Sequence, residues 1–339
     1  MQPSEKFTRI ALLLLVAIVL LALAGISVGV SQISPLHVLK IVVHALNPEW
    51  VVQEWRNSQA VIILELRAPR TVLAMLTGAG LAVCGGALQA ATRNPLTDPF
   101  LLGVSSGASL GAVFVISHLG LALGAYTLPL FSFFGGLLSF ILLLLLLRNP
   151  ANQRPDRLVL AGVAISFILM AATNWLIYWG DQRAAQSIVF WMLGGLGRAR
   201  WDLLPIPSVL IIGGIILLIC HARNLNALMM GQESAAALGI PVNRVRIEIL
   251  LLATLVSSLI VSLTGTIGFV GLVVPHIVRS IVGGDNRLLL PLSALFGAAF
   301  VLLIDIIARV MLAPQELPIG IITGAVGGSY FCYLLAKRE

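Results

Sequence analysis

Residues 99–147 read PFLLGVSSGASLGAVFVISHLGLALGAYTLPLFSFFGGLLSFILLLLLL and contain no Asp, Glu, Lys or Arg. A helix crosses the hydrocarbon core of a bilayer in about 20 residues. This run of 49 residues is too long for one such helix and fits two. It therefore predicts a pair of membrane-spanning helices with a break near residues 117–127.

The rest of the chain has the same character. Of its 339 residues, 59% are apolar and only 10% are charged, and the mean hydropathy is +1.02. Soluble domains have about 45–50% apolar and 25% charged residues. The composition excludes an ordinary cytosolic enzyme, a disordered chain and a nucleic-acid binder, although the net charge is +7. Further uncharged runs predict spans at residues 10–30, 71–92, 158–180, 203–222 and 317–336, and residues 288–308 predict another span that carries one charge, Asp305.

Residues 249–278 form an uncharged run that is long for one span and short for two. Arginines flank this run on both sides and place both flanks in the cytoplasm. A chain that starts and ends on the same side of the membrane must cross it twice. We expect a tight turn at Thr264-Gly265-Thr266, and Pro275 predicts that the second crossing is broken or tilted. The total is ten transmembrane helices in an all-α polytopic membrane protein. Residues 1–339 are expected to form a single transmembrane domain.

The basic residues predict the orientation. Thirteen of the 21 Lys and Arg residues fall on segments that this arrangement makes cytoplasmic, which places both termini in the cytoplasm. These residues are Lys6, Arg9, Arg93, Arg148, Arg154, Arg157, Arg223, Arg244, Arg246, Arg279, Arg287, Lys337 and Arg338. An alternative is a signal peptide cleaved after Ala22-Leu23-Ala24. Cleavage would leave nine spans, and the apolar run continues to about Val30, which is long for a signal peptide.

Groups for catalysis or ion coupling are scarce. Asp305 stands alone within a span, four residues before Arg309, so we expect an ion pair along one helix. A proton- or sodium-coupled carrier needs titratable groups near the midplane of the membrane, which argues against that alternative. No lysine follows a glycine, so there is no phosphate-binding loop, and any ATPase is a separate subunit. A membrane-embedded enzyme is the remaining alternative, but the sequence offers no catalytic residue, metal site or cofactor site.

Two glycine series have helical spacing: Gly103-x3-Gly107-x3-Gly111 and Gly320-x3-Gly324-x3-Gly328. Small residues on one helix face let two backbones approach closely. Close helix packing is the simpler interpretation, and the alternative is that these thin faces border a wide pathway.

A short helix is predicted at residues 232–238 in the cytoplasmic segment between the sixth and seventh spans. Gly239 ends it and Pro241 prevents its continuation. Its small residues would suit docking into a cleft of another protein, and a simple connector is the alternative.

Several longer motifs occur in order along the chain. They are Leu66-Arg-Ala-Pro-Arg70, Gln89-x3-Arg93-Asn-Pro-Leu-Thr-Asp-Pro-x3-Gly103-Val-Ser-x-Gly-Ala108, Leu160-Ala-Gly-Val-Ala164, Gly231-x7-Gly239, Gly268-Phe-Val-Gly-Leu-Val-Val-Pro-His-Ile-Val-Arg279, Asp305-x3-Arg309 and Glu316-Leu-Pro-Ile-Gly320. With these motifs the sequence resembles the FecCD family of ATP-binding-cassette (ABC) importer permeases over nearly its whole length. That family takes up ferric siderophores, haem and cobalamin.

The resemblance implies a BtuC-like permease fold in the cell inner membrane. Two copies form one pathway at their interface, two ATP-binding cassette subunits bind on the cytoplasmic side, and a periplasmic substrate-binding protein docks on the other. The permease is not an enzyme, and it needs no cofactor and no nucleic acid. The cargo is expected to be an iron chelate, as a ferric siderophore or haem, or cobalamin, and the sequence does not select among them.

The resemblance also assigns roles to residues. The fifth span lines the pathway, the corner Asn94-Pro95-Leu96 narrows its cytoplasmic end, and Asp156 belongs to a second constriction, where this sequence departs from the cobalamin permease pattern. The short cytoplasmic helix is predicted to couple to the ATPase. The residues expected to carry that coupling are Gly231, Ser234, Ala235, Ala236, Leu238 and Gly239.

Three arginines are candidates for docking the binding protein. Arg67 and Arg70 stand at the outer start of the second span, against the positive-inside trend, and folding could bring Arg309 to the same face. In the family, arginines at matching positions engage glutamates on the two lobes of the binding protein. The alternative is that they extend to lipid headgroups, or that Arg309 only neutralises Asp305.

Overall fold

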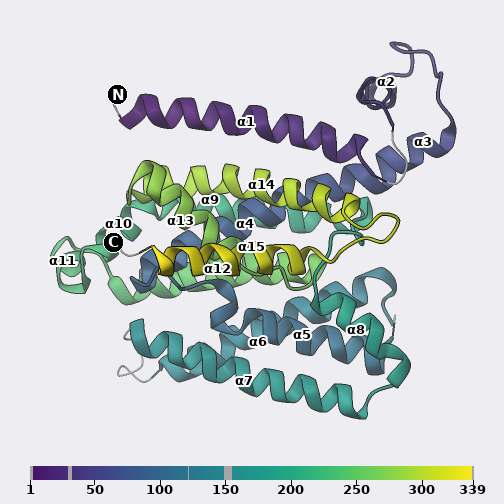
Figure 1. The fold of residues 1–339 in the computed structure, drawn as a ribbon. Helices are drawn as coiled ribbons and strands as arrows, with labels where there is room; N and C mark the ends of the chain where they lie inside the picture. The colour runs from purple at the N-terminus through teal and green to yellow at the C-terminus, as the bar shows by residue number, and fades with distance from the viewer. Residues whose placement is uncertain (1–2, 30–32, 121, 149–154, 338–339) are drawn as a thin grey trace.

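Uncharged runs become helices throughout the computed structural model, which describes residues 3–29, 33–120, 122–148 and 155–337. No strand occurs in those ranges. The longer helices lie side by side, with α1 along one edge of the bundle and α7 along the opposite edge (Figure 1). The helices of eight or more residues are α1 (Pro3–Ser27), α2 (Pro35–Leu46), α4 (Ala68–Thr92), α5 (Val104–Phe114), α6 (Thr127–Leu147), α7 (Pro155–Trp179), α8 (Ala185–Met192), α9 (Pro205–Cys220), α10 (Ala222–Met229), α12 (Val242–Thr264), α13 (Val270–Val282), α14 (Asn286–Val310) and α15 (Ile319–Ala336).

Short helical segments connect or extend them. The α-helical ones are α3 (Asn57–Val61) and α11 (Gln232–Ala237). The π-helical turns are η1 (Ile62–Arg67), which leads into α4, and η3 (Val115–Leu119), which continues α5. The 3₁₀ turns are η2 (Pro99–Leu102), η4 (Gly124–Tyr126), η6 (Gln182–Ala184) and η7 (Trp201–Leu203).

The two predicted helices within residues 99–147 are present as α5 with η3 and as α6. The chain leaves the first at Gly120, whose φ of 65° is readily available only to glycine, and re-enters helix at Thr127. The break therefore lies where the sequence predicted it.

Residues 249–278 also contribute to two helices. α12 ends at Thr264, Gly265 has a φ of 70°, and α13 begins at Val270. The second crossing, which we expected to be broken or tilted because it holds Pro275, is not broken at the proline, since α13 continues through it from Val270 to Val282. The interruption falls instead in the connecting residues 265–269, which precede the proline.

Seven helices are long and apolar enough to cross a membrane, and the bent pair α9–α10, with a 49° change of direction, brings the number to eight. Helices lie in all ten intervals that the sequence assigned to spans, but α5 with η3 and α13 are shorter than a full crossing. Ten crossings are thus not established by length and composition.

α4 is the central helix, and most of its side chains are buried. It packs against α9, α12, α13 and α14. A side chain at Gly78 would collide with the backbone of Gly297 on α14, and one at Gly85 with the backbone of Gly271 on α13. These contacts depend on glycine because no side chain fits between the two backbones.

The two glycine series behave differently. On α5, Gly107 and Gly111 face the backbone of α6 at Gly135 and Phe131, as close packing predicts. On α15, nothing lies within 4 Å of where a side chain would begin at Gly324 or Gly328. The first series packs helices together. In the second, Gly320 packs against the backbone of Leu193, and only Gly324 and Gly328 leave a thin face open.

This difference predicts opposite tolerances. Gly107→Ala is expected to lower the free energy of unfolding by about 1–3 kcal/mol, because the new methyl group forces α5 and α6 apart. Gly324→Ala is expected to change it by less than about 0.5 kcal/mol. Thermal unfolding of the two purified variants in one detergent measures the difference. Equal melting temperatures would contradict the packing assigned to Gly107.

Candidate functional site

A groove with a volume of about 410 Å³ lies between α5, α7, the residues joining α12 to α13, and α15. None of its lining residues is ionisable. Its polar groups are hydroxyls and one amide, supplied by Ser105, Ser106, Ser109, Thr173, Asn174 and Thr266. Such a surface can form hydrogen bonds with a passing molecule without holding it by charge.

Helical spacing explains how these groups converge. Ser105 and Ser109 are four residues apart on α5, and Met170 and Asn174 are four apart on α7, so each pair lies on one face of its helix. The Thr173 hydroxyl donates to the Leu169 carbonyl at 2.8 Å, which satisfies its proton and leaves its lone pairs directed outward. α7 therefore contributes to the groove, while the pathway role predicted for the fifth span stays a prediction.

Sequence reasoning missed the serines of α5. The available signal was the spacing Ser105-Ser106-x2-Ser109 inside an apolar run. Only Ser105 belongs to a motif named above, and Ser106 and Ser109 were not singled out. Its meaning depends on which face of α5 is left uncovered, and only the packing of α6 and α7 determines that.

Arg67, Arg70 and Arg309 converge at the end of the bundle away from both termini, and all three are buried. They border a cavity of about 400 Å³ that also contains Glu316. The expectation that folding brings them to one place is met. Their guanidinium groups, however, are bound within the protein.

Asp305 lies between two of these arginines. Its Oδ1 accepts from Arg70 Nε at 2.9 Å, and its Oδ2 is 3.0 Å from Arg309 Nη2. The pairing of Asp305 with Arg309 along α14 is the one predicted from their spacing. The bond to Arg70 joins α14 to α4, and it was not predicted, because 235 positions separate the two residues.

Glu316 is a further member of this arginine cluster. Its two carboxylate oxygens lie 3.0 and 2.8 Å from Arg70 Nη1, and its side chain is about half exposed. It lies in the segment between α14 and α15, so the ion pair fixes that segment to α4.

The cluster also caps α1. Arg309 Nη1 donates to the Gly25 carbonyl at 2.8 Å and to the Val28 carbonyl at 3.1 Å. Arg67 Nη1 donates to the carbonyls of Ile26 and Ser27 at 2.9 and 2.8 Å. The last carbonyls of a helix lack partners within it and carry partial negative charge, which two guanidinium groups satisfy here.

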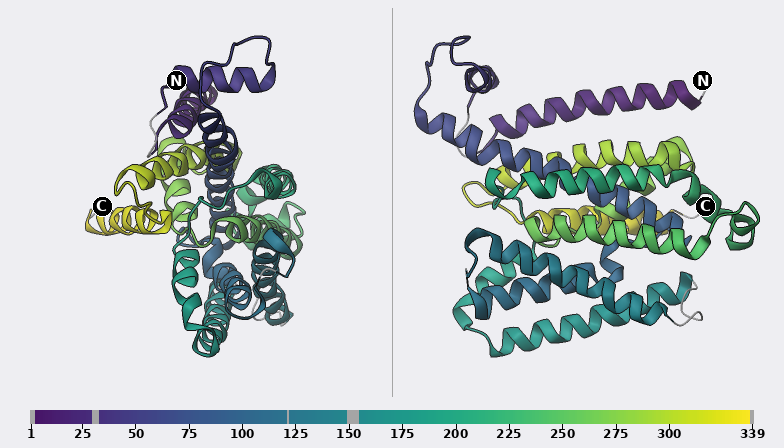
Figure 2. Two further views of the ribbon diagram at one scale, coloured as in Figure 1. Left: turned by 90° about the vertical axis from the view of Figure 1, so that its right-hand side faces the viewer. Right: turned by 180° about the vertical axis from the view of Figure 1, so that it is seen from behind.

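The predicted coupling helix is present as α11, and it projects beyond the bundle at the end where both termini lie (Figures 1 and 2). Gly231 and Gly239 flank it with φ values of 118° and 78°. Ala235 is buried against the bundle, whereas Ser234, Ala236 and Leu238 are exposed. An exposed leucine on a short projecting helix is a contact available to another protein.

The predicted gate residues lie where α4 ends. Arg93 adopts a left-handed conformation, and Asn94 accepts from the Leu96 amide at 2.9 Å, which makes a tight turn with Pro95 and Leu96 exposed. Asp98 then caps η2 through the amides of Phe100 and Leu101, and burial raises the pKa of its carboxyl to about 6. Asp156 lies in the first turn of α7, and its side chain is outside the described residues.

Within the described ranges, no group of three His, Cys, Asp or Glu residues could hold a metal ion. The comparisons with known proteins agree with a transport role. Residues 14–337 match the model of the FecCD transport family.

Three comparisons illustrate the match. The chain is 40% identical over 281 residues to the hemin transport system permease of Yersinia pestis, covering 82% of this chain and 84% of that protein. It is 36% identical over 327 residues to the Fe(3+) dicitrate transport system permease FecD of Escherichia coli K12, covering 96% and 99%. A solved structure described as an inward-facing conformation of a metal-chelate type ABC transporter superposes with a TM-score of 0.84 at 29% identity, covering 98% of this chain and 100% of that one.

The geometry of the arginine cluster predicts a large effect at Asp305. Asp305→Asn removes the negative charge between two buried guanidinium groups, and breaking a buried pair costs about 3–5 kcal/mol. A loss of that size corresponds to about 10 °C in melting temperature. The matched control is Asp202→Asn, because Asp202 pairs with Arg200 at the surface, where such pairs contribute at most about 1 kcal/mol. Similar melting temperatures for the two variants would show that the cluster does not hold the helices together.

Proposed function

The chain belongs to the FecCD transport family, and from that premise we propose how it moves its cargo. It is the membrane permease of an ABC importer, a multi-pass protein of the inner membrane. The permease itself is not catalytic, and the ATPase is a separate subunit. As a member of this family it associates with ATP-binding subunits and with a substrate-binding protein.

We propose ten crossings. The seven long helices, the bent pair α9–α10, α5 with η3, and α13 together make ten. Short helices are tolerated at membrane depth where protein surrounds them. α5 packs against α6 and α7, and α13 packs against α4 and α14. An even number of crossings also agrees with two termini at the same end, which the basic residues assign to the cytoplasm (Figure 2).

We propose that the pathway forms where two copies of this chain meet. The observation that carries this proposal is the uncharged groove, which is lined by α7 and α15. Within the spanning windows of these helices, only 22% and 17% of residues are buried inside one chain. The open glycine face of α15 at Gly324 adds room there. A two-fold interface would cover both helices and close the groove into a channel.

The cargo proposed is a bulky metal chelate, such as an iron chelate, haem or cobalamin. The names of the similar permeases specify hemin, Fe(3+) dicitrate and vitamin B12. A groove with hydroxyls and no charges binds such a molecule weakly, so the cargo can leave it. Selection among cargoes then rests with the binding protein.

Transport assays in proteoliposomes test this function. Uptake of hemin, ferric dicitrate or cobalamin is expected only when permease, ATPase and the cognate binding protein are all present with ATP. Uptake by the permease alone along a proton or sodium gradient would overturn the proposal.

The coupling role of α11 predicts a local effect. Leu238→Asp or Ala236→Arg is expected to release the ATPase and reduce ATP-driven uptake more than tenfold. Melting temperature should not change, since both side chains are exposed. Leu46→Asp is the matched control, because Leu46 is an exposed leucine at the other end of the bundle. Retention of the ATPase by the α11 variants would contradict the assignment.

We also propose that Arg67, Arg70 and Arg309 attract the binding protein. Three arginines against Asp305 and Glu316 leave the cluster positive at the rim of a cavity that could admit a carboxylate. Charge pairs at a rim weaken with salt. Since the cluster also caps α1, charge reversal would disturb the fold, and a neutral variant is the better test.

Arg67→Gln is expected to weaken binding of the binding protein at low salt and to flatten the dependence on salt between about 50 and 500 mM NaCl. Arg56→Gln, at an exposed arginine near the same end, is the control. Affinity can be measured by biolayer interferometry with the permease in nanodiscs. An unchanged affinity at both salt concentrations would exclude this docking role.

A further inference from the structure

A second cavity, separate from the groove, lies inside one chain at the end of the bundle away from the termini. Its volume is about 390 Å³, within the range of ligand pockets. The starts of α6 and α9, the end of α12, α8, and the loop between α8 and α9 line it. Most of this lining is apolar, including Leu128, Trp191, Leu204 and Leu263.

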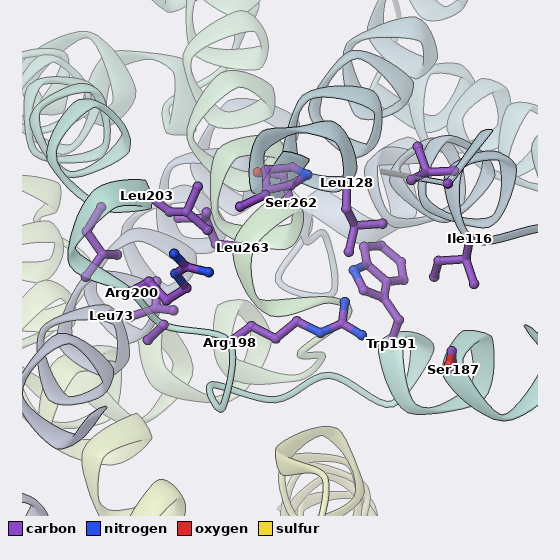
Figure 3. A pocket seen from close by; sticks show the side chains of 16 residues that line it. Leu73, Ile116, Leu128, Ser187, Trp191, Arg198, Arg200, Leu203, Ser262 and Leu263 are labelled. Atoms are coloured by element: carbon purple, nitrogen blue, oxygen red, sulfur yellow. The ribbon is translucent and has the colours of Figure 1, made fainter. Parts of the chain in front are cut away.

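Two arginines reach into this apolar space from the loop, Arg198 toward Trp191 and Arg200 toward Leu203 and Leu263 (Figure 3). Arg200 is neutralised by a bidentate pair with Asp202 at 3.0 Å. Arg198 has no hydrogen-bond or ion-pair partner among the residues that the structure describes. Arg198 is exposed at the edge of this apolar lining, so its guanidinium is available to a ligand that carries both an anion and an apolar part.

The loop that carries Arg198 is held in place from two sides. The Gly195 amide donates to the Thr264 carbonyl at 2.7 Å, and the Ile319 amide donates to the Gly194 carbonyl at 3.0 Å. Neighbouring Leu196 and Ala199 are buried. Because the backbone is fixed by α12 and α15, Arg198 is positioned at this cavity before any ligand arrives.

The helices beside the cavity carry exposed apolar surface. α12 packs against both α6 and α9, and the Tyr126 hydroxyl at the start of α6 donates to the Asp202 carbonyl before α9 at 3.0 Å. Both flanking helices expose large apolar side chains, among them Phe134 on α6 and Ile206 and Val209 on α9. An acyl chain could therefore lie partly in the cavity and partly along this surface.

We propose that this cavity binds one anionic phospholipid of the outer leaflet, with the lipid phosphate paired to Arg198 and an acyl chain among Leu128, Leu204 and Leu263. A guanidinium forms two parallel hydrogen bonds with a phosphate. Trp191 beside it is buried and forms part of the apolar wall. The bound lipid would fill the space between α6 and α9 and stiffen the loop that also borders the arginine cluster through Gly197 and Ala199.

Native mass spectrometry and thermal unfolding of the purified permease test this site. Phosphatidylglycerol is expected to remain bound and to raise the melting temperature, whereas phosphatidylcholine with the same chains and inorganic phosphate should do neither. Arg198→Gln is expected to weaken phosphatidylglycerol binding about tenfold. Arg183→Gln, at an exposed arginine outside the cavity, should leave it unchanged.

A second pair of variants tests the cavity itself. Ser187→Trp places an indole where Ser187 lines the space, and it should displace the lipid without loss of folding. Gln186→Trp, one residue away on the exposed surface of α8, should not. Equal retention of phosphatidylglycerol by wild type, Arg198→Gln and Ser187→Trp would overturn the proposal. So would an Arg198→Gln variant that loses affinity only for the binding protein, because Arg198 would then be a docking residue.

Discussion

Close contact between helix backbones is the constraint on which the rest of this bundle depends. In lipid, association of helices gains little from the hydrophobic effect, so it relies on packing. α4 occupies the centre because Gly78 and Gly85 let α14 and α13 approach to backbone contact. The positions of Gln89 near one end of α4 and of Arg70 near the other follow from that approach. Gln89 reaches the Gly271 carbonyl and Arg279, and Arg70 reaches Asp305.

A second level of order comes from buried charge. Ion pairs deep in a protein cost desolvation energy and persist when each group is fully partnered. Asp305 meets this condition because its carboxylate pairs with both Arg70 and Arg309. Other N–H groups of Arg309, and those of Arg67, donate to the backbone carbonyls at the end of α1. One cluster thus connects α1, α4, α14 and the segment that carries Glu316. Any contact that the binding protein makes here would act on groups that already determine how these helices meet.

The sequence predicted local features, such as where helices begin and end. It did not predict contacts between residues far apart in the chain, because those contacts depend on how the helices pack. The uncharged run at residues 99–147 predicted two helices and their break, and Gly231 and Gly239 marked the bounds of α11. The pair Asp305–Arg309 followed from helical spacing, but Arg70 and Glu316 joined it only through the contact of α4 with α14. Pro275 misled because a proline inside a helix removes one backbone N–H donor, and α13 tolerates that loss without ending. The interruption between the two helices begins at Gly265 instead. The groove serines have a helical spacing in the sequence, but its meaning depends on which face of α5 the other helices leave uncovered, and Arg198 stands in no pattern that separates it from ordinary loop residues.

The distribution of charge also constrains how transport can be driven. The lining of the groove contains no titratable side chain, so a proton gradient has no group there on which to act. Work must enter from elsewhere, and α11 projects from the bundle at the end where both termini lie. The arginine cluster and its connected helix ends lie at the opposite end. Between these ends run helices in backbone contact, such as α4 with α14, which transmit displacement because close-packed interfaces deform little. In the transporter that we propose, energy input at α11 and cargo entry beside the arginine cluster lie at opposite ends of the bundle, and the groove between them has no ionisable lining residue.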